Sequence, residues 1–258
     1  MSVLYHRCLE YIMENPKTMK TIGKILLVLV LIGAICFGAL HLYASDYYSA
    51  DKEAICAFLP GADIEERELP GGNLAYVPGE YTAGIVFYPG GKVEHTAYEP
   101  LMRALASRGI LTVLVKMPYN LAVLKQNAAD GIQEQFPEIE HWYMAGHSLG
   151  GSMAASYVSK NSDNFDGLIL LAAYSTADLT DSKVNVASIY GSLDGVMNKE
   201  KYDKYLVNLP DTLEETVIEG ANHAGFGMYG EQKGDGTATL TNAKQIEITA
   251  DIIADFVN

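Results

Sequence analysis

The chain has 258 residues, of which 49% are hydrophobic and 19% are charged. This composition is typical of a globular protein and argues against a disordered chain. Once a terminal segment is subtracted, about 200 residues remain, which is enough for one domain with a sizeable core. Residues 46–258 carry 30 acidic and 14 basic side chains, a net charge of −16. A surface this acidic argues against nucleic acid as a partner and against docking on anionic lipid headgroups.

The chain has three cysteines, and only Cys56 lies in the expected globular part, because Cys8 and Cys36 precede it. No disulfide can therefore form within that part, and cysteine usage does not reveal the compartment. No cluster of Cys and His has the spacing of a metal site. We expect neither a metal nor another cofactor.

Residues 25–43 form a continuous apolar stretch whose only strongly polar member is His41, near its end. As a helix, these residues would span roughly 28 Å, close to the thickness of the bilayer core. A buried core helix is one alternative, but core helices are usually amphipathic and this stretch is apolar all round. A cleaved signal peptide is another, but the run is long for one, and Ala44 and Ser45 form only a weak cleavage site. We predict a retained transmembrane helix.

The charges beside this helix predict its orientation. Three lysines precede it and two aspartates follow it: Lys17, Lys20 and Lys24, then Asp46 and Asp51. By the positive-inside rule, the N-terminus is cytoplasmic and the domain lies outside the cell. The predicted parts are a cytoplasmic segment (1–24), a single transmembrane helix (25–43) in the cell membrane, a tether (44–60) and a domain (61–258).

From about residue 60 the chain alternates between strand and helix patterns. Short apolar runs predict strands at 74–77, 85–88, 110–115, 142–145, 168–172, 184–190 and 215–218. Helices are predicted at 99–108, 121–136, 150–160, 199–208 and 243–257. This alternation predicts an α/β fold: a doubly wound, mostly parallel sheet with helices on both faces. Functional sites of such sheets lie at the carboxyl ends of the strands. The connection at 173–183 is too short to hold a large lid.

The pattern Gly-x-Ser-x-Gly at 146–150 predicts a nucleophile at Ser148. Alone it is weak, since chance gives about 0.1 matches in such a chain. Here it follows a predicted strand and opens a helix of small residues. Glycines let the strand and helix approach, and the serine projects at the helix N-terminus, where the dipole favours developing negative charge. The alternative is a serine that only caps the helix. We expect His147 to pack or hydrogen-bond, and Ser152 to be a small packing residue.

A serine hydroxyl becomes a good nucleophile only when a base takes its proton, and the base needs an acid to fix its tautomer. In folds of this kind, the acid and then the histidine follow the serine in the chain. Of the six histidines, only His223 follows the last predicted strand. Asp194, in the turn after strand 184–190, is the predicted acid, and Asp178, after the preceding strand, is its rival.

Two backbone N–H groups are expected to stabilise the oxyanion of the tetrahedral intermediate, each lowering the barrier by roughly 3 kcal/mol. One is the N–H of Leu149. The other comes from the loop at 89–92, where two glycines let the backbone turn its N–H groups inward. Gly91 and Lys92 are the two candidates, and the sequence does not separate them. Glu94, His95 and Tyr98 follow, and each is equally compatible with a place in the pocket and on the surface.

Four segments together resemble one known family. They are Phe-Tyr-Pro-Gly-Gly-Lys-Val-Glu at 87–94, Gly-His-Ser-Leu-Gly-Gly at 146–151, Gly-Ser-Leu-Asp-Gly at 191–195 and Asn-His-Ala-Gly-Phe-Gly at 222–227. They resemble bacterial single-domain α/β-hydrolases akin to the dienelactone hydrolases, and the resemblance extends over about residues 60–258. It implies a lidless, esterase-like hydrolase. Dienelactone hydrolases use a cysteine nucleophile, whereas position 148 is a serine, so their substrate is not carried over.

These observations predict a membrane-anchored, carboxylesterase-like serine hydrolase that cleaves an ester-like acyl bond of a small molecule. Two other classes of function stay open. One is a cell-envelope acyltransferase, which would use the same triad and acyl-enzyme. The other is a non-catalytic binding module built on the same fold. A peptidase is favoured less, because no added cap domain is present to select its substrate.

Overall fold

The computed structural model describes residues 16–58 and 64–257. The chain divides into two compact units, one ending at Asp46 and the other formed by Tyr47–Asn258. Residues 1–15, which include Cys8 and most of the predicted cytoplasmic segment, lie outside the described residues. The last two residues of the predicted tether also lie outside them.

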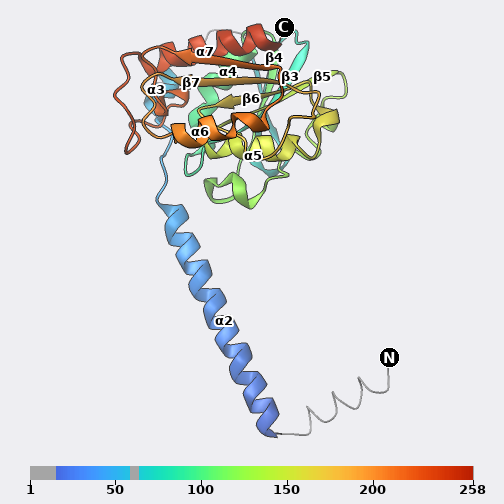
Figure 1. The fold of residues 1–258 in the computed structure, drawn as a ribbon, viewed down its shortest axis with the longest axis vertical. Coiled ribbons are helices and arrows are strands. Elements are labelled where there is room, and N and C mark those ends of the chain that lie inside the picture. The colour runs from blue at the N-terminus through green and yellow to red at the C-terminus, as the bar shows by residue number, and fades with distance from the viewer. Residues whose placement is uncertain (1–15, 59–63, 258) are drawn as a thin grey trace. The chain divides into compact units, whose positions relative to one another are not determined.

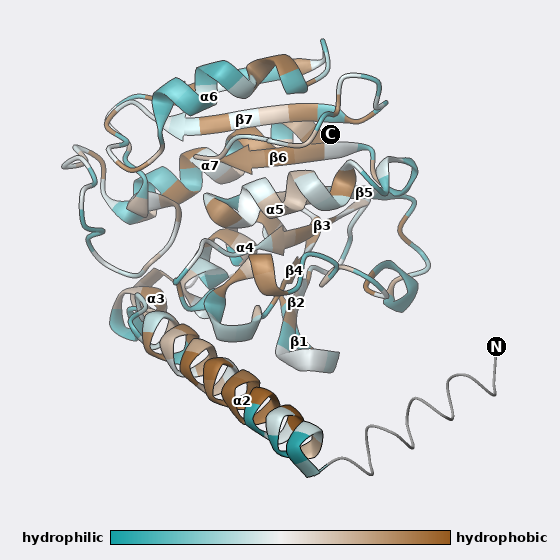
Figure 2. Cartoon of the chain, turned by 60° about the horizontal axis from the view of Figure 1, so that its bottom comes forward, coloured by the Kyte–Doolittle hydropathy of each residue, from teal (hydrophilic) through white to brown (hydrophobic). Residues whose placement is uncertain are grey.

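The first unit contains helix α2, Pro16–Ser45, which is 30 residues long. Its central part is rich in Ile, Leu, Val and Ala, and most of it is brown in Figure 2. By length and composition alone, it can cross a membrane. The helix extends beyond the predicted span at both ends. At about 1.5 Å per residue, its 30 residues cover about 45 Å, which is longer than the hydrocarbon core of a bilayer.

The second unit is built around one twisted sheet (Figure 1) of eight strands in the order β1-β2-β4-β3-β5-β6-β7-β8. The strands are β1 (Glu65–Leu69), β2 (Asn73–Val77), β3 (Ala83–Tyr88), β4 (Ile110–Leu114), β5 (His141–His147), β6 (Gly167–Leu171), β7 (Asn185–Gly191) and β8 (Leu213–Ile218). The first two strands pair in antiparallel fashion with their neighbours, and the other six are mutually parallel. The predicted α/β fold with a mostly parallel sheet is confirmed.

All seven predicted strands are present, and β1 is the one that the sequence did not predict. Four of its five residues, 65–68, are charged and exposed. It is an edge strand, paired only with β2. An edge strand with so little buried surface has no hydrophobic pattern to identify it.

Helices cover both faces of the sheet (Figure 1). They are α4 (Glu99–Ala106) and α7 (Asn242–Val257) on one face and α5 (Leu149–Val158) on the other, with α6 (Lys199–Tyr205) beside β7. In β3, Ile85 and Phe87 join the core layer of α4 and α7, while Val86 and Tyr88 join the layer of α5. Successive side chains point to opposite faces of a strand, so burial on both faces explains the unbroken apolar runs in the sequence.

The helix predicted at 121–136 is wrong. This segment forms only short 3-10 turns, at Ala122–Leu124 and Gln133–Gln135. The Tyr88 hydroxyl donates to the carbonyl of Gln126 and accepts from the N–H of Ala129, both at 2.8 Å. Gly131 then adopts a φ of +77°. These local bonds and the left-handed residue offer the backbone an alternative to a continuous helix.

The tether predicted at 44–60 is also largely wrong. Residues 44 and 45 end α2, and the chain joins the domain from Tyr47 onward. Tyr48 forms an isolated bridge with Val93. A short helix, α3 (Lys52–Phe58), follows and buries Ile55 against the core. Burial of the apolar side chain of Ile55 stabilises the packing of this segment on the domain relative to an extended chain in solvent.

The carboxyl ends of the six parallel strands meet at one edge of the sheet. The loops that leave β3, β5, β7 and β8 at this edge carry residues 89–94, Ser148, Asp194 and His223. The connection from β6 to β7, residues 172–184, contains no helix or strand, so no lid domain is inserted there. Four separate loops therefore bring the predicted site residues to a common edge.

Candidate active site

Ser148 lies in the tight turn between β5 and α5, as predicted. Its φ of +52° and ψ of −123° place it in a conformation that residues other than glycine rarely adopt. The backbone N–H of Ser148 donates to the carbonyl of Leu171, at the end of β6, over 2.9 Å. A side chain held in a strained turn at a helix N-terminus is typical of an exposed nucleophile.

The serine turn packs directly on the loop that follows β3. A Cβ atom at Gly150 would lie 2.2 Å from the carbonyl oxygen of Pro89, so only glycine fits there. A Cβ atom at Gly91 would lie 2.7 Å from Cδ2 of Leu149. Backbone of one loop thus faces backbone of the other at close range, which is the arrangement that a pair of converging N–H donors requires.

The hydrogen bonds of the loop after β3 separate the two predicted oxyanion donors. The N–H of Lys92 donates to the carbonyl of Asn120 over 2.8 Å, and the N–H of Gly90 donates to the Tyr98 hydroxyl over 3.1 Å. The N–H of Gly91 has no acceptor in the described part of the chain. The N–H of Leu149 opens α5 and has no acceptor within the helix. These bonds rule against Lys92 and favour Gly91, together with Leu149.

His223 and Asp194 form a buried pair. Nδ1 of His223 lies 2.8 Å from Oδ2 of Asp194, and the two side chains are only 1% and 3% exposed. The other carboxylate oxygen, Oδ1, accepts from the N–H groups of Val196 and Met197, each over 2.8 Å. Burial by itself raises the pKa of Asp194, but the bonds from His223 and from these N–H groups outweigh it and hold the pKa below its usual value.

An ionised carboxylate can only accept a hydrogen bond, so Nδ1 of His223 carries the hydrogen between the two side chains, and in the neutral imidazole the lone pair is then on Nε2. Nε2 is buried and has no hydrogen-bond partner among the described residues. The Ser148 hydroxyl makes no hydrogen bond to it in this conformation. Catalytic hydrogen bonds are often long before substrate binds, and a free acceptor at Nε2 is what a general base needs.

Asp178, the rival acid, lies elsewhere. Its carboxylate is exposed and accepts from the N–H and hydroxyl of Thr180, over 3.0 and 2.7 Å. These bonds close a local turn of the connection between β6 and β7. The observed contacts favour Asp194.

His147 packs and hydrogen-bonds, as predicted. It is 1% exposed, and its Nδ1 lies 2.7 Å from the Tyr98 hydroxyl. Burial, together with the neighbouring His223, holds the pKa of His147 well below its usual value, so this imidazole is neutral. The ring centroids of His147 and His223 are 4.5 Å apart.

Tyr98 is fully buried and connects two loops, a role that the sequence did not separate from a surface position. Its hydroxyl accepts from Gly90 and faces Nδ1 of His147. Since neutral Nδ1 can accept, the hydroxyl donates to it. This tyrosine thus ties the loop after β3 to the residue before Ser148.

A cavity of about 240 Å³ opens beside Ser148. It is lined by residues of the serine turn, of the end of β6 and of the segment after Asp194: Ser148, Leu149, Ser152, Ala172, Ala173, Tyr174, Val196, Met197 and Asn198. Ser152, expected only to pack, also donates its hydroxyl to the carbonyl of Tyr174 over 2.8 Å. Val196 and Met197 line this cavity and donate their N–H groups to Asp194, so the serine turn and the acid border one space.

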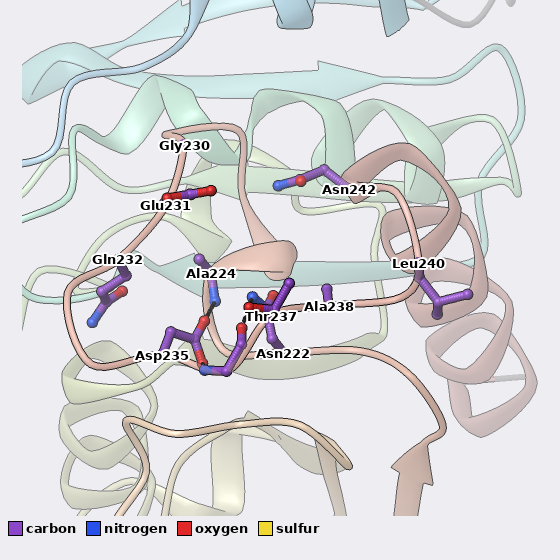
Figure 3. A pocket seen from close by; sticks show the side chains of 11 residues that line it. Asn222, Ala224, Gly230, Glu231, Gln232, Asp235, Thr237, Ala238, Leu240 and Asn242 are labelled. Atoms are coloured by element: carbon purple, nitrogen blue, oxygen red, sulfur yellow. Dashed lines mark hydrogen bonds between the residues drawn. The ribbon is translucent and has the colours of Figure 1, made fainter.

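Asp235 is a residue of the site that the sequence did not indicate. It lies in the long segment between His223 and α7, and its carboxylate accepts backbone N–H groups of the histidine loop (Figure 3). No motif surrounds it, and its partners in the histidine loop and at Gly195 lie 11 to 40 residues away in the sequence. Among the described residues, no group of three or more His, Cys, Asp and Glu side chains could hold a metal ion.

The sheet order, the tight serine turn and the loops gathered at one edge define the α/β-hydrolase class of fold. The sequence profile described as the alpha/beta hydrolase family matches residues 84–247, more than half of the chain. The chain therefore belongs to the α/β hydrolase family, as its motifs predicted, and membership indicates hydrolase activity.

The structure is similar to the crystal structure of a predicted CIB-like hydrolase from Thermoplasma acidophilum, with a TM-score of 0.53 and 14% sequence identity. The match covers 76% of this chain and 100% of that one. At this identity, the likeness concerns the fold alone. None of the curated proteins matches the chain significantly.

Proposed function

We propose that this protein is a serine hydrolase that cleaves an ester-like acyl bond through a Ser148–His223–Asp194 triad. The single observation that carries the proposal is the buried 2.8 Å hydrogen bond between Asp194 and His223. It fixes the imidazole at the edge of the sheet where Ser148 projects, and Nε2 of this ring has no hydrogen-bond partner among the described residues. This is the combination that converts a serine hydroxyl into a nucleophile.

In the proposed reaction, Oγ of Ser148 attacks the ester carbonyl while Nε2 of His223 takes the hydroxyl proton. The oxyanion forms between the N–H groups of Leu149 and Gly91. When the intermediate collapses, the carbon–oxygen bond to the alcohol breaks and His223 returns its proton to the leaving alkoxide. Water then attacks the acyl-enzyme and gives a proton to Nε2 of His223. His223 passes this proton to Oγ of Ser148 as the acyl–oxygen bond breaks, which releases the carboxylic acid and regenerates the free Ser148 hydroxyl.

The cavity beside Ser148 supports a small substrate group. Its volume of about 240 Å³ lies below the roughly 300–1,000 Å³ of pockets that hold drug-sized ligands. Its walls are formed by small residues such as Ala172 and Ala173 with the larger Tyr174 and Met197. We infer that the group bound there is short, and that activity falls as this group lengthens.

Hydrolysis of p-nitrophenyl acetate and butyrate tests the proposal. Ser148→Ala should abolish hydrolysis, because no other side chain takes the position of its hydroxyl. Ser159→Ala is a matched control in the last turn of the same helix, where the hydroxyl bonds only the carbonyl of Ser156. It should retain full activity. Esterase activity that survives in Ser148→Ala contradicts the proposal.

We also propose that α2 is a signal-anchor and that the domain lies outside the cell. The support is the length and apolar character of α2 and the lysines at its N-terminal end. Cys56 is an exposed thiol of the domain and serves as a natural reporter. A membrane-impermeant maleimide should label Cys56 in intact cells. Labelling only after permeabilisation would reverse the assigned orientation.

A further inference from the structure

Asp235 belongs to a long segment that lies against the histidine loop. Residues 227–241 connect the turn Ala224–Phe226 to α7 and contain no helix or strand. They are nevertheless packed: Met228 and Tyr229 are only 5% and 6% exposed. The N–H of Met228 donates to the carbonyl of Ala97 over 2.8 Å. Loops of this length without secondary structure are uncommon in compact domains and are frequently functional.

The carboxylate of Asp235 collects backbone N–H groups from two loops at once. Oδ1 accepts from Gly195 over 3.0 Å and from His223 over 3.2 Å. Oδ2 accepts from Ala224 over 2.8 Å, as a dashed line in Figure 3 shows. A further bond, from Gly236 to Oδ1 over 2.8 Å, turns the segment itself.

Two of these donors define the triad geometry. His223 is the proposed base, and Gly195 directly follows Asp194, the proposed acid. One carboxylate therefore holds the backbone of both partners of the 2.8 Å hydrogen bond. Hydrogen bonds from N–H groups to an ionised carboxylate are roughly twice as strong as those between neutral groups.

Close packing between the same segments reinforces this link. A Cβ atom at Gly195 would lie 2.6 Å from the carbonyl oxygen of Gly234, and one at Gly236 would lie 2.0 Å from that of Leu193. The side chain of Asn222 donates to the carbonyl of Gly236 over 2.8 Å. The segment 234–236 thus contacts residues on both sides of the Asp194–His223 pair.

We propose that Asp235 is a positioning residue that sets the alignment of His223 with Asp194. This inference rests on the proposed triad. The loops after β7 and β8 come from separate strands, and the carboxylate of Asp235 joins their backbones.

Other bonds join the two loops closer to their strands, such as the one from the N–H of Leu193 to the carbonyl of Ala221, but among the described residues the carboxylate of Asp235 alone holds the N–H groups of Gly195 and His223 together. Without it, the backbone at these two positions can shift, and a misplacement of about 1 Å at a reacting group can slow a reaction about 100-fold. The carboxylate bonds backbone groups and does not line the cavity beside Ser148, so it is not itself a catalytic residue.

The test compares Asp235→Asn with Glu231→Gln in the full chain in detergent. The substituted asparagine would offer Ala224 an amide N–H₂ instead of an acceptor oxygen. Glu231 is exposed on the same segment and makes no hydrogen bond or ion pair in the described part of the chain. Its substitution therefore removes the same charge without removing a loop contact.

Asp235→Asn should lower kcat at least tenfold, and up to about 100-fold, with KM close to that of the wild type. It should also weaken the low-field proton resonance of the His223 Nδ1–H. Glu231→Gln should leave both readouts unchanged. Wild-type kcat in Asp235→Asn, or an equal loss in Glu231→Gln, would overturn the inference.

Two further measurements keep the result decisive. If Asp235→Asn does not accumulate as folded protein, Asp235→Glu keeps the charge and displaces the carboxylate by one methylene, and the same fall in kcat at constant KM is expected. Wild-type kcat in Asp235→Glu would then overturn the inference. Labelling of wild-type Ser148 by a fluorophosphonate separates the two claims. A labelled wild type with an unaffected Asp235→Asn refutes only the positioning role, whereas an unlabelled wild type refutes the triad itself.

Discussion

Nδ1 of His223 lies 2.8 Å from Oδ2 of Asp194, with both side chains almost completely buried. Asp194 comes from the loop after β7 and His223 from the loop after β8, so the pair exists only because two neighbouring parallel strands end at the same edge. A carboxylate in this place fixes the tautomer of the imidazole and stabilises its protonated form.

Asp194→Asn should therefore lower kcat by a factor on the order of 10⁴, because an amide can hold the imidazole in the wrong tautomer. Steady-state hydrolysis of a p-nitrophenyl ester measures the change. Asp178→Asn is the matched control, since that carboxylate closes an exposed turn with Thr180. Equal losses in the two variants would contradict the assignment of Asp194.

The depressed pKa of Asp194 also predicts a pH dependence of stability. Because the pKa of this carboxyl is lower in the folded protein than in the unfolded chain, its contribution to stability is fully present above the unfolded value, about 3.9. The contribution is lost as the pH falls through the lower, folded pKa. Thermal unfolding of the wild type and of Asp194→Asn should differ most between pH 5 and 8, and the difference should begin to shrink only when the pH falls below about 4, toward the folded pKa. If the stability difference between the wild type and Asp194→Asn grew as the pH fell, the pKa of Asp194 would be raised on folding rather than lowered, which would contradict the prediction.

Tyr98→Phe should destabilise the domain by about 1–3 kcal/mol, because it leaves the buried N–H of Gly90 and Nδ1 of His147 without partners. Denaturant unfolding in detergent measures this loss. Tyr81→Phe removes a hydroxyl that bonds Glu138 at the surface and should change stability by less than about 0.5 kcal/mol. Similar effects of the two substitutions would show that the buried hydrogen bonds of the Tyr98 hydroxyl to Gly90 and His147 do not stabilise the fold.

The domain should begin at Tyr47 rather than at residue 61. A chain that starts at residue 47 keeps the bonds of Tyr48 to Lys92 and Glu94 and the buried side chain of Ile55. A chain that starts at residue 61 loses them, and the burial of Ile55 alone contributes about 1.5–3 kcal/mol. Melting temperatures of the two chains measure the difference. Equal stability of the two chains would contradict this boundary and would support the tether that the sequence predicted at 44–60.

Features that depend on local pattern could be predicted from the sequence. The strand and helix runs and the serine turn follow from apolar periodicity and from glycine positions. Each of these signals lies within a few consecutive residues, so no knowledge of the folded chain is needed to read it.

Features that depend on contacts between distant backbone groups could not be predicted. The bond from the N–H of Lys92 to the carbonyl of Asn120 favours Gly91 as the oxyanion donor, and a bond to a backbone carbonyl cannot be foreseen because every residue type has one. The carboxylate of Asp235 accepts from the N–H groups of Gly195 and His223. These bonds involve backbone groups, so no residue pattern in the sequence predicts them. The helix predicted at 121–136 does not form for the same reason. The hydroxyl of Tyr88 bonds the carbonyl of Gln126 and the N–H of Ala129, and a continuous helix would use these backbone groups itself.

The most direct test of the central claim is the mapping of a fluorophosphonate adduct by mass spectrometry on the full chain. An activated serine reacts at its hydroxyl, while an ordinary serine does not. We predict a single adduct on Ser148, abolished in Ser148→Ala and strongly slowed in Asp194→Asn. An unlabelled wild type, or an adduct on another residue that persists in Ser148→Ala, would contradict the account.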